Sequence, residues 1–224
     1  TINSYIYLAV NRCVAPHLKV IYSELELTDD VEKIKHNRVR ECLKHFELPS
    51  NVEICSFSDV PVRGTGLGSS STFTVGLINA LHRLTHGRNI DTNELAELAS
   101  YIEIIKCNEP IGKQDQFAAA YGGFNTIHFE NGKVRVKHLD VDQITLMELD
   151  HNLLAFNTGI SRMASTILTQ QVENLKDINT VELTKSMVEL AKTGVKLLQK
   201  KKVDDFGILL DQAWQVKKKL TDNI

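Results

Sequence analysis

The sequence predicts an α+β fold, in which strands and helices are mixed up to about residue 140 and helices prevail after it. Short apolar and aromatic runs with strand character are concentrated in the first 60 residues. A further strand pair is expected around Asn131-Gly132, which is a strong hairpin signal. Apolar residues at helical spacing dominate the remainder, above all after residue 150. Strands followed by a run of helices are typical of the α+β class.

The first third of the chain predicts strands, one helix and a further strand. Residues 1–25 favour β-structure, because apolar and aromatic side chains cluster around Pro16. An amphipathic helix is expected over 29–46, where apolar residues recur at roughly helical period among charges. Residues 52–57 then predict a strand that runs into Pro61.

The middle of the chain predicts helices with clear end signals. A helical stripe follows the glycine-rich stretch and ends at Gly87. Asp91, with Glu94 three residues later, predicts the N-terminal cap of a helix over 92–106. The next expected elements are a break at 108–112, a short helix over 113–121 that ends at Gly122-Gly123, and hairpin strands over 124–129 and 133–139.

The last part of the chain predicts mostly helix. Composition shifts near residues 140–150, and we place a domain boundary there, which gives domains 1–145 and 146–224. The expected elements are a buried strand over 153–156 and helices over about 161–175, 181–200 and 203–220. The apolar residues expected on the facing sides of the last two helices are Met187, Leu190, Ala191 and Leu198, and Phe206, Leu210 and Ala213.

Composition excludes several classes of protein. The 26 basic and 28 acidic side chains leave a net charge of −2, whereas a nucleic-acid-binding domain normally has a basic surplus. No apolar run approaches the roughly 18 residues of a membrane span, and no signal peptide opens the chain. The 4 cysteines form no C-x-x-C pair, and the histidines show no metal-ligand spacing, so we expect reduced thiols, a cytoplasmic protein and no structural zinc.

A glycine-serine loop is the strongest functional signal. Gly64, Gly66 and Gly68 alternate after a predicted strand, and three serines open the following helix. Glycines allow backbone N–H groups to crowd around an anion, and the helix N-terminus adds a positive dipole end. Serine hydroxyls can reach phosphate oxygens or a Mg²⁺ ion. A flexible turn with a serine helix cap is the alternative that the composition leaves open.

Three other known motifs do not match this loop. A Walker A loop requires a lysine after its last glycine, and none follows Gly68. A dinucleotide-binding fingerprint would place glycine where Ser69 stands. The nucleophile elbow G-x-S-x-G does not occur here.

Two carboxylates, Glu103 and Asp115, are candidates for chemistry. Asp115 follows Glu103 by twelve positions, across the Pro110 break, and such a kink can fold one carboxylate toward the other. Phosphoryl transfer to a hydroxyl needs a metal ion, backbone donors for the phosphates and a carboxylate that orients or deprotonates the hydroxyl. Taken singly, Glu103 could equally lie on a solvated helix face, and Asp115 could cap a helix.

Residues 61–71 resemble the phosphate loop of the GHMP kinases, whose core reads G-L-G-S-S-A. Gly66 through Ser70 match that core, and Ser71 replaces the alanine. The resemblance implies ATP binding. The residues it assigns to the nucleotide are Gly64, Gly66, Leu67, Gly68, Ser69, Ser70 and Ser71.

The run Gly112-Lys-Gln-Asp-Gln116 resembles the substrate loop of the same family. The resemblance implies that Asp115 is the catalytic base and that Glu103 and Ser70 hold Mg²⁺. A further segment over 157–165 resembles the T-G-x-x-R-x-A-S pattern of one group within the family, the heptose 7-phosphate kinases. The candidate substrate-binding residues in these two segments are Lys113, Gln114, Gln116 and Arg162. For Lys113 and Arg162, which are cations suited to a phosphate, a surface salt bridge is the alternative.

Residues 109–125 look most like the heptose 7-phosphate kinases within this family. That likeness implies ATP- and Mg²⁺-dependent phosphorylation of the anomeric C1 hydroxyl of D-glycero-D-manno-heptose 7-phosphate. A fucose- or galactose-type sugar 1-kinase is the alternative within enzymes. A non-catalytic sensor of the same fold that binds nucleotide and sugar is the alternative outside them, and the Glu103–Asp115 pair argues for catalysis.

The resemblance also implies the architecture and the partners. It predicts a ribosomal-S5-like N-terminal domain over 1–145 and part of a helix-rich ferredoxin-like domain over 146–224. The family's N-terminal glycine-rich substrate segment and its late glycine-rich motif do not occur in these 224 residues, so we expect a fragment with both domains incomplete. The implied partner is a small-molecule sugar phosphate, and a homodimer is allowed, whereas nucleic acid and membrane are not expected.

Overall fold

The structure, a computed structural model, describes residues 2–59, 66–130, 132–156 and 177–220. The chain divides into two compact units: unit 1 comprises Thr1–Gly123 and Ile127–Val136, and unit 2 comprises Phe124–Thr126 and Lys137–Ile224. The domain boundary that the sequence predicts between residues 145 and 146 stays a prediction. No helix among the described residues combines the length and the apolar composition that a membrane span requires.

Unit 1 contains a four-stranded sheet. Its strands, in spatial order, are β1 (Ile6–Arg12), β4 (Val52–Ser58), β2 (Leu18–Ile21) and β3 (Leu25–Thr28). β1 pairs with β4 and β2 with β3 in antiparallel fashion, whereas β2 and β4 run parallel. Val52 and Ile54 alternate with less buried residues, and so do Leu18 and Val20 on the neighbouring strand, so one face of the sheet is apolar. The strands expected before Pro61 are thus confirmed.

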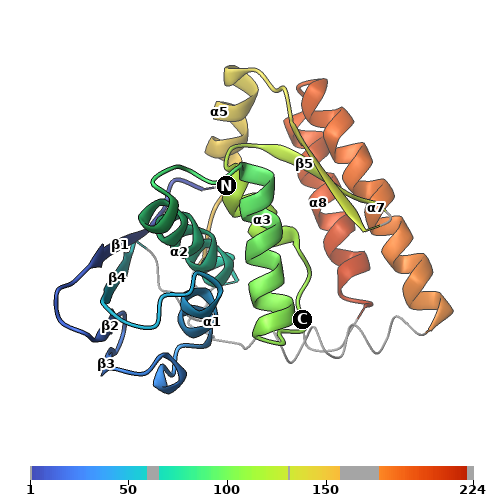
Figure 1. Cartoon of the computed structure of the whole chain (residues 1–224). Helices are drawn as coiled ribbons and strands as arrows, with labels where there is room; N and C mark the ends of the chain where they lie inside the picture. Colours follow the sequence, from blue (N-terminus) through green and yellow to red (C-terminus); the bar gives the residue numbers. More distant parts are fainter. Residues whose placement is uncertain (1, 60–65, 131, 157–176, 221–224) are drawn as a thin grey trace. The chain divides into compact units, whose positions relative to one another are not determined.

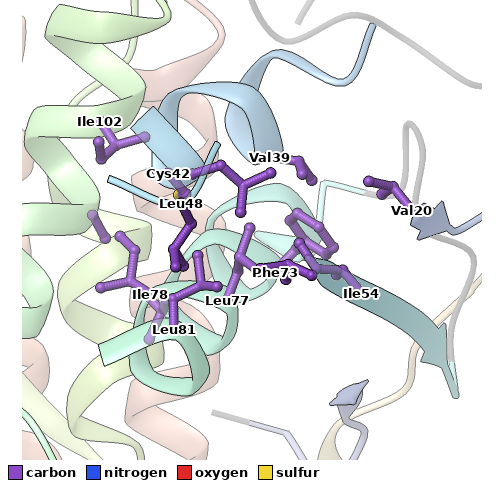
Figure 2. Close-up of a cluster of buried hydrophobic side chains, with 14 of the residues drawn as sticks. Val20, Val39, Cys42, Leu48, Ile54, Phe73, Leu77, Ile78, Leu81 and Ile102 are labelled. Atoms are coloured by element: carbon purple, nitrogen blue, oxygen red, sulfur yellow. The ribbon is translucent and has the colours of Figure 1, made fainter. Parts of the chain in front are cut away.

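A group of helices packs against the apolar face of this sheet and against one another. They are α1 (Asn37–His45), α2 (Ser69–His86), α3 (Thr92–Ser100), the π-helical turn η2 (Tyr101–Lys106) and α4 (Gln114–Tyr121). Figure 1 shows α1 and α2 beside the sheet, with α3 on the side of them that is away from the strands. In Figure 2, Val20 and Ile54 of the sheet lie in one buried cluster with Phe73 and Leu77 of α2, and this cluster fixes the helix on the sheet.

Local signals set the ends of these helices. Asp91 caps α3, since its Oδ1 accepts hydrogen bonds from the backbone N–H groups of Asn93 (2.9 Å) and Glu94 (3.2 Å). α2 ends at Gly87, whose φ of 69° lies in the left-handed region that favours glycine. Both end signals that the sequence predicts are confirmed.

The single helix expected over 29–46 is wrong in its extent. A short 3₁₀ turn, η1 (Val31–Lys33), comes first, and Ile34 then adopts an extended conformation. α1 begins only at Asn37, with the Nδ1 atom of His36 accepting a bond from the Val39 N–H group at 3.4 Å. Asp30 caps η1 and His36 caps α1, so two separate helical elements form here. The spacing of the apolar residues alone indicates a single helix.

The hairpin is confirmed, because β5 (Asn125–Glu130) and β6 (Lys133–His138) form a two-stranded sheet. The helices described in unit 2 are α5 (Gln143–Asn152), α7 (Ile178–Gln199) and α8 (Val203–Lys217). α7 and α8 approach closely at Gly194, where a Cβ atom would lie 3.1 Å from Cε2 of Phe206. The helix expected over about 161–175 lies outside the described residues.

Two expectations for unit 2 are wrong. Residues 153–156 form no strand, and Leu154 and Phe156 are 77% and 81% exposed. A run of only four apolar residues shows no periodicity that could distinguish a strand from irregular chain. Here the run is irregular chain that directly follows α5, which ends at Asn152. On α8 the buried residues are Val203 and Leu209, whereas Leu210 is exposed, because one position turns a helix by about 100°. On α7 Leu198 is buried, but Ala191 is exposed.

Candidate active site

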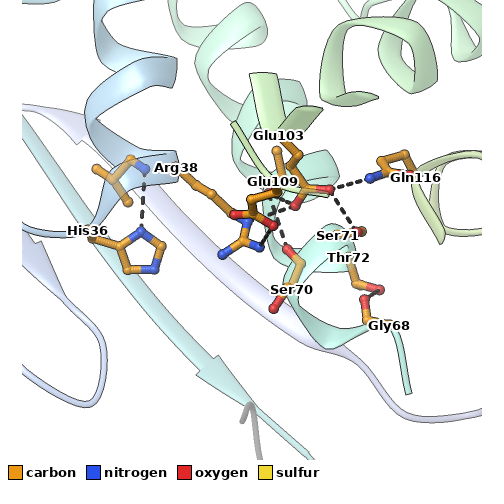
Figure 3. Close-up of polar contacts among 11 residues, drawn as sticks. His36, Arg38, Gly68, Ser70, Ser71, Thr72, Glu103, Glu109 and Gln116 are labelled. Atoms are coloured by element: carbon orange, nitrogen blue, oxygen red, sulfur yellow. Dashed lines mark hydrogen bonds and ion pairs between the residues drawn. The ribbon is translucent and has the colours of Figure 1, made fainter. Parts of the chain in front are cut away.

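Glu103 is the centre of a buried polar network in unit 1 (Figure 3). Its side chain is fully buried, and both carboxylate oxygens accept hydrogen bonds. Arg38 Nε lies 2.8 Å and Thr74 Oγ1 2.7 Å from Oε1. Ser71 Oγ donates to Oε2 at 2.7 Å, and so does the side-chain amide of Gln116. A buried carboxylate requires such donors, because an unpaired charge in the interior is costly.

Arg38 links two carboxylates. Its Nη2 atom lies 2.5 Å from Oε2 of Glu109, while its Nε atom contacts Glu103. Burial raises the pKa of Glu109; the Arg38 charge opposes this shift, and the nearby Glu103 charge adds to it. The planar guanidinium group can hold both acids because its donors point in fixed directions. Arg38 thereby ties α1 to the segment that follows α3.

The backbone after α3 places both acids on one side of Arg38. Glu103 belongs to the π-helical turn η2, and such turns are frequent at functional sites. Asn108 then has a φ of 54°, which reverses the chain, and the Glu109 N–H group donates to the Glu103 carbonyl at 3.1 Å. The side chain of Glu109 therefore returns to the vicinity of Glu103.

The glycine-serine loop leads into the N-terminus of α2. Gly68 is the N-cap residue with a φ of 69°, and it has no side chain that could occupy the first N–H groups of the helix. The dipole of an 18-residue helix favours an anion at this end. Ser69 and Ser71 are buried, whereas Ser70 is exposed and Leu67 is 52% exposed. Gly64 lies outside the described residues.

Asp115 lies against this loop. A Cβ atom at Gly68 would be 3.4 Å from both Cγ and Oδ2 of Asp115, which is van der Waals contact, so the two residues are direct neighbours. The φ of 69° at Gly68 favours glycine there. Asp115 stands in the first turn of α4. Desolvation by surrounding protein atoms, and secondly the Glu103 charge, raise the pKa of the Asp115 carboxyl group.

The other predicted site residues are dispersed. Lys113 forms an ion pair with Glu97 of α3, with Nζ 2.7 Å from Oε2. Gln114 is exposed at the start of α4, whereas Gln116 is fully buried and directs its amide nitrogen at Glu103. The Oε1 atom of Gln116 is buried and has no hydrogen-bond partner among the described residues. Arg162 lies outside the described residues.

The donors around Glu103 do not fit direct coordination of Mg²⁺ by this side chain. A carboxylate offers about four lone-pair sites, and Arg38, Thr74, Ser71 and Gln116 already direct donors at them. An ion bound to Glu103 would have to displace one of these donors. Ser70 is exposed, and its hydroxyl is absent from this set of donors.

Sequence reasoning missed Arg38 and Thr74. Arg38 is 65 positions from Glu103 on a helix rich in charged residues, and nothing in its local sequence separates it from the other cations of α1. Thr74 lies three positions after Ser71 and four after Ser70 on the same helix, so it shares their face of α2. That spacing is the sequence signal by which Thr74 could have been identified.

Comparisons with known proteins show what the chain is similar to. Residues 35–123 match the family described as GHMP kinases N terminal domain. The chain is 32% identical over 198 residues to D-glycero-alpha-D-manno-heptose 7-phosphate kinase of Campylobacter jejuni, covering 86% of this chain and 56% of that protein. It is 28% identical over 182 residues to the bifunctional fucokinase/GDP-fucose pyrophosphorylase of Arabidopsis thaliana, covering 79% of this chain and 17% of that protein.

The fold is similar to that of a solved structure described as D-glycero-D-manno-heptose 1-phosphate kinase from Bacteroides thetaiotaomicron. The TM-score is 0.76 at 24% identity, covering 97% of this chain and 68% of that one. A likeness at this identity supports the fold alone. The chain spans little more than half the length of the Campylobacter jejuni relative.

Proposed function

We propose, from the premise that residues 35–123 are a GHMP kinase N-terminal domain in a chain with the GHMP kinase fold, that this protein is an ATP-dependent sugar kinase. The proposed reaction is phosphorylation of the anomeric C1 hydroxyl of D-glycero-D-manno-heptose 7-phosphate. Similarity to a named heptose 7-phosphate kinase over 86% of the chain supports this choice of sugar. Because the chain spans 56% of that relative, the activity is proposed for the complete protein.

The observation that carries the proposal is the approach of Asp115 to Gly68. The loop before α2 is suited to the phosphates of a nucleotide, since backbone N–H groups and the helix dipole meet there. A carboxylate beside that loop is suited to a hydroxyl that attacks the terminal phosphate. A phosphate-binding turn without catalysis has no need of this carboxylate.

Each residue then has a separate role in the transfer. Asp115 orients the sugar hydroxyl and accepts its proton, while the first turn of α2 binds the phosphate oxygens of ATP. Glu103 holds Ser71, Gln116 and Arg38 in place, and so supports the loop and α4 from within. Positioning of this kind is the main contribution a protein makes to phosphoryl transfer.

Mg²⁺ enters the proposal as the ion that ATP carries. The assignment of Ser70 and Glu103 as its ligands stays a prediction, and the four donors around Glu103 do not favour it for the arrangement described here. A cytoplasmic location, a sugar-phosphate substrate and a homodimer are kept as proposals that the complete protein must test.

The deciding experiment measures nucleotide consumption by the complete protein on sugars and sugar phosphates, for the native chain and for Asp115→Asn. We expect activity on the heptose 7-phosphate and a loss of about 10²-fold or more in kcat for the variant, with nucleotide affinity retained. Asp29→Asn is the matched control, because its side chain is 84% exposed and far in sequence from the loop. Full turnover by Asp115→Asn would remove Asp115 from the mechanism.

The alternatives have distinct outcomes in the same screen. A preference for an unphosphorylated sugar would favour the fucose- or galactose-type kinase, and similarity to the fucokinase of Arabidopsis thaliana is the observation behind it. Binding of nucleotide and sugar without any turnover would favour the non-catalytic sensor.

A further inference from the structure

We propose that Cys13, His17 and Glu53 form a three-ligand site for Zn²⁺, with the fourth position open. One ligand atom of each residue, a sulfur, an imidazole nitrogen and a carboxylate oxygen, lies within 4.8 Å of the other two. The three side chains are half-buried. The site is independent of the proposed kinase reaction.

The topology of the sheet brings these residues together. Cys13 follows the last residue of β1, His17 precedes the first residue of β2, and Glu53 is the second residue of β4. β4 lies between β1 and β2 in the sheet, so all three ligands belong to the same end of it. Glu53 is 36 positions from His17 in the sequence, which is why local metal-ligand spacing gives no signal.

The loop that carries two of the ligands is held by Asn51. Its side-chain nitrogen donates to the carbonyl oxygens of Cys13 (3.4 Å), Val14 (3.3 Å) and Ala15 (3.1 Å). The Cys13 N–H group donates to the Asn51 carbonyl at 3.0 Å, and the Val52 N–H group donates to the His17 carbonyl at 3.2 Å. Backbone contacts on both sides thus fix the loop relative to Glu53, and fixed ligands lose little entropy on binding an ion.

The separation of two ligand atoms already suits a tetrahedral ion. Zn²⁺ binds nitrogen and oxygen at about 2.0–2.2 Å, which places such ligand atoms about 3.3–3.5 Å apart at a tetrahedral angle. His17 Nε2 lies 3.4 Å from Glu53 Oε1. The Cys13 thiol contacts the carbonyl oxygens of Ala15 at 3.3 Å and His17 at 3.8 Å. Because a thiol is a weak hydrogen-bond donor, rotating the sulfur toward a metal ion would break only weak contacts.

The mixture of ligands selects the cation. Thiolate and imidazole favour Zn²⁺ and similar borderline ions over Mg²⁺ or Ca²⁺, which take oxygen ligands. Binding releases the thiol proton of Cys13 to solvent, since the thiolate is the ligand. The charge of Lys19 should weaken metal binding, because its Nζ atom lies 3.9 Å from the Glu53 oxygen that would bind the cation.

This site and the candidate active site have no residue in common. Glu53 is near the start of β4, and the glycine-serine loop follows the end of that strand. A strand of 7 residues spans roughly 20 Å at about 3.3 Å per residue. Loss of the metal site and loss of the kinase reaction are therefore separable by experiment.

The test measures metal binding by the full chain in the absence of nucleotide and Mg²⁺. Zn²⁺ is titrated against a chromophoric chelator, and Co²⁺ is added separately to record the charge-transfer absorption of a cobalt–thiolate bond. We expect one ion per chain. Cys13→Ser and His17→Ala should each weaken Zn²⁺ binding by about 100-fold or more, since even loss of a residue behind a metal ligand costs 10–100-fold.

Matched variants test whether these three side chains, rather than their neighbours, bind the ion. Cys55→Ser changes a half-buried thiol two positions after Glu53 and should leave both signals unchanged. Lys19→Gln removes the opposing cation and should strengthen Zn²⁺ binding several-fold. Glu53→Gln keeps the hydrogen-bonding shape and should weaken it. The melting temperature of each metal-free variant establishes that it is folded.

Two results would overturn the proposal. One is a cobalt–thiolate band that persists in Cys13→Ser or is absent from the native chain. The other is Zn²⁺ binding that survives in Cys13→Ser and His17→Ala but disappears in His86→Ala. That result would move the ion to the stacked rings of His82 and His86, whose centroids are 4.4 Å apart on α2.

Discussion

At the scale of single residues, Glu103 is first a structural group. Its buried carboxylate satisfies four donors, so we expect Glu103→Ala to lower the free energy of unfolding by about 3–5 kcal/mol, the usual cost of breaking a buried ion pair. Glu103→Gln should cost less, because the amide keeps one carbonyl acceptor. Equilibrium unfolding in urea measures both changes.

Glu97→Ala removes an acid that is 39% exposed and pairs with Lys113, and it should change stability by no more than about 1 kcal/mol. If Glu103 serves only as a metal ligand, both of its variants will be as stable as the native chain, and only the Mg²⁺ requirement will change.

Asp115 gives a prediction for the dependence of activity on pH. A base must be ionised, and the pKa of Asp115 is raised, first by desolvation and then by Glu103. The acid limb of the kcat profile should therefore lie above the ordinary aspartate value of about 3.9. In Glu103→Gln the limb should shift to lower pH, because one of the two causes is gone.

The profile of kcat against pH for the native protein and Glu103→Gln tests this. Because its pKa is raised in the folded state, Asp115 binds a proton more tightly in the folded than in the unfolded protein. Protonation of Asp115 at low pH therefore stabilises the folded state. Acid unfolding caused by this group is thus not the reason for the acid limb. An acid limb that stays in place in Glu103→Gln would show that Glu103 does not act on the base.

At the scale of elements, the cap of α3 connects sequence to site. Asp91→Ala removes the acceptor for two N–H groups and should cost about 1 kcal/mol, whereas Asp91→Asn should be close to neutral. α3 continues directly into η2, which carries Glu103, so local opening should extend to that segment. Amide hydrogen exchange measures it. Equal exchange in η2 for the two variants would mean that the cap acts on α3 alone.

The elements also show what sequence can predict. β4, α2 and the Asn131-Gly132 hairpin are predictable because their signals are local: alternation, a glycine end and a turn dipeptide. The π-helical turn η2 is not, since the helical period reads the same through Tyr101–Lys106. The strand prediction for residues 153–156 is wrong because only tertiary contacts decide whether a short apolar run is buried.

The candidate site follows the same rule. The glycine loop and Asp115 stand out in the sequence, since glycines and an Asp-Gln pair occur in a recognisable order. Arg38 joins them only through the fold, across 65 positions to Glu103 and 71 to Glu109. The trio of Cys13, His17 and Glu53 likewise exists only when strand order is known. Contacts between residues that are far apart in the sequence are not encoded in local residue spacing, so the sequence alone does not predict them.

At the scale of the whole molecule, the proposed sugar-phosphate substrate requires a binding contact of its own. The chain is similar over 86% of its length to a named heptose 7-phosphate kinase, and a sugar that carries a phosphate needs a cation besides those that bind ATP. Of the two cations that the sequence analysis places near the substrate, Lys113 pairs with Glu97, and Arg162 is the other. Arg162 lies outside the described residues, so this prediction rests on the sequence.

We expect Arg162→Ala in the complete protein to lower kcat/KM for the heptose 7-phosphate by roughly 30- to 140-fold. This corresponds to a loss of about 2–3 kcal/mol of transition-state stabilisation, which is the range for loss of a charge-assisted contact. Activity on the unphosphorylated heptose should change little, because that sugar lacks the dianion. Steady-state kinetics on both sugars, with Lys113→Ala as the comparison, measures the difference. Equal losses on both sugars would assign Arg162 to the nucleotide or to folding, and a loss confined to Lys113→Ala would move the phosphate contact to α4.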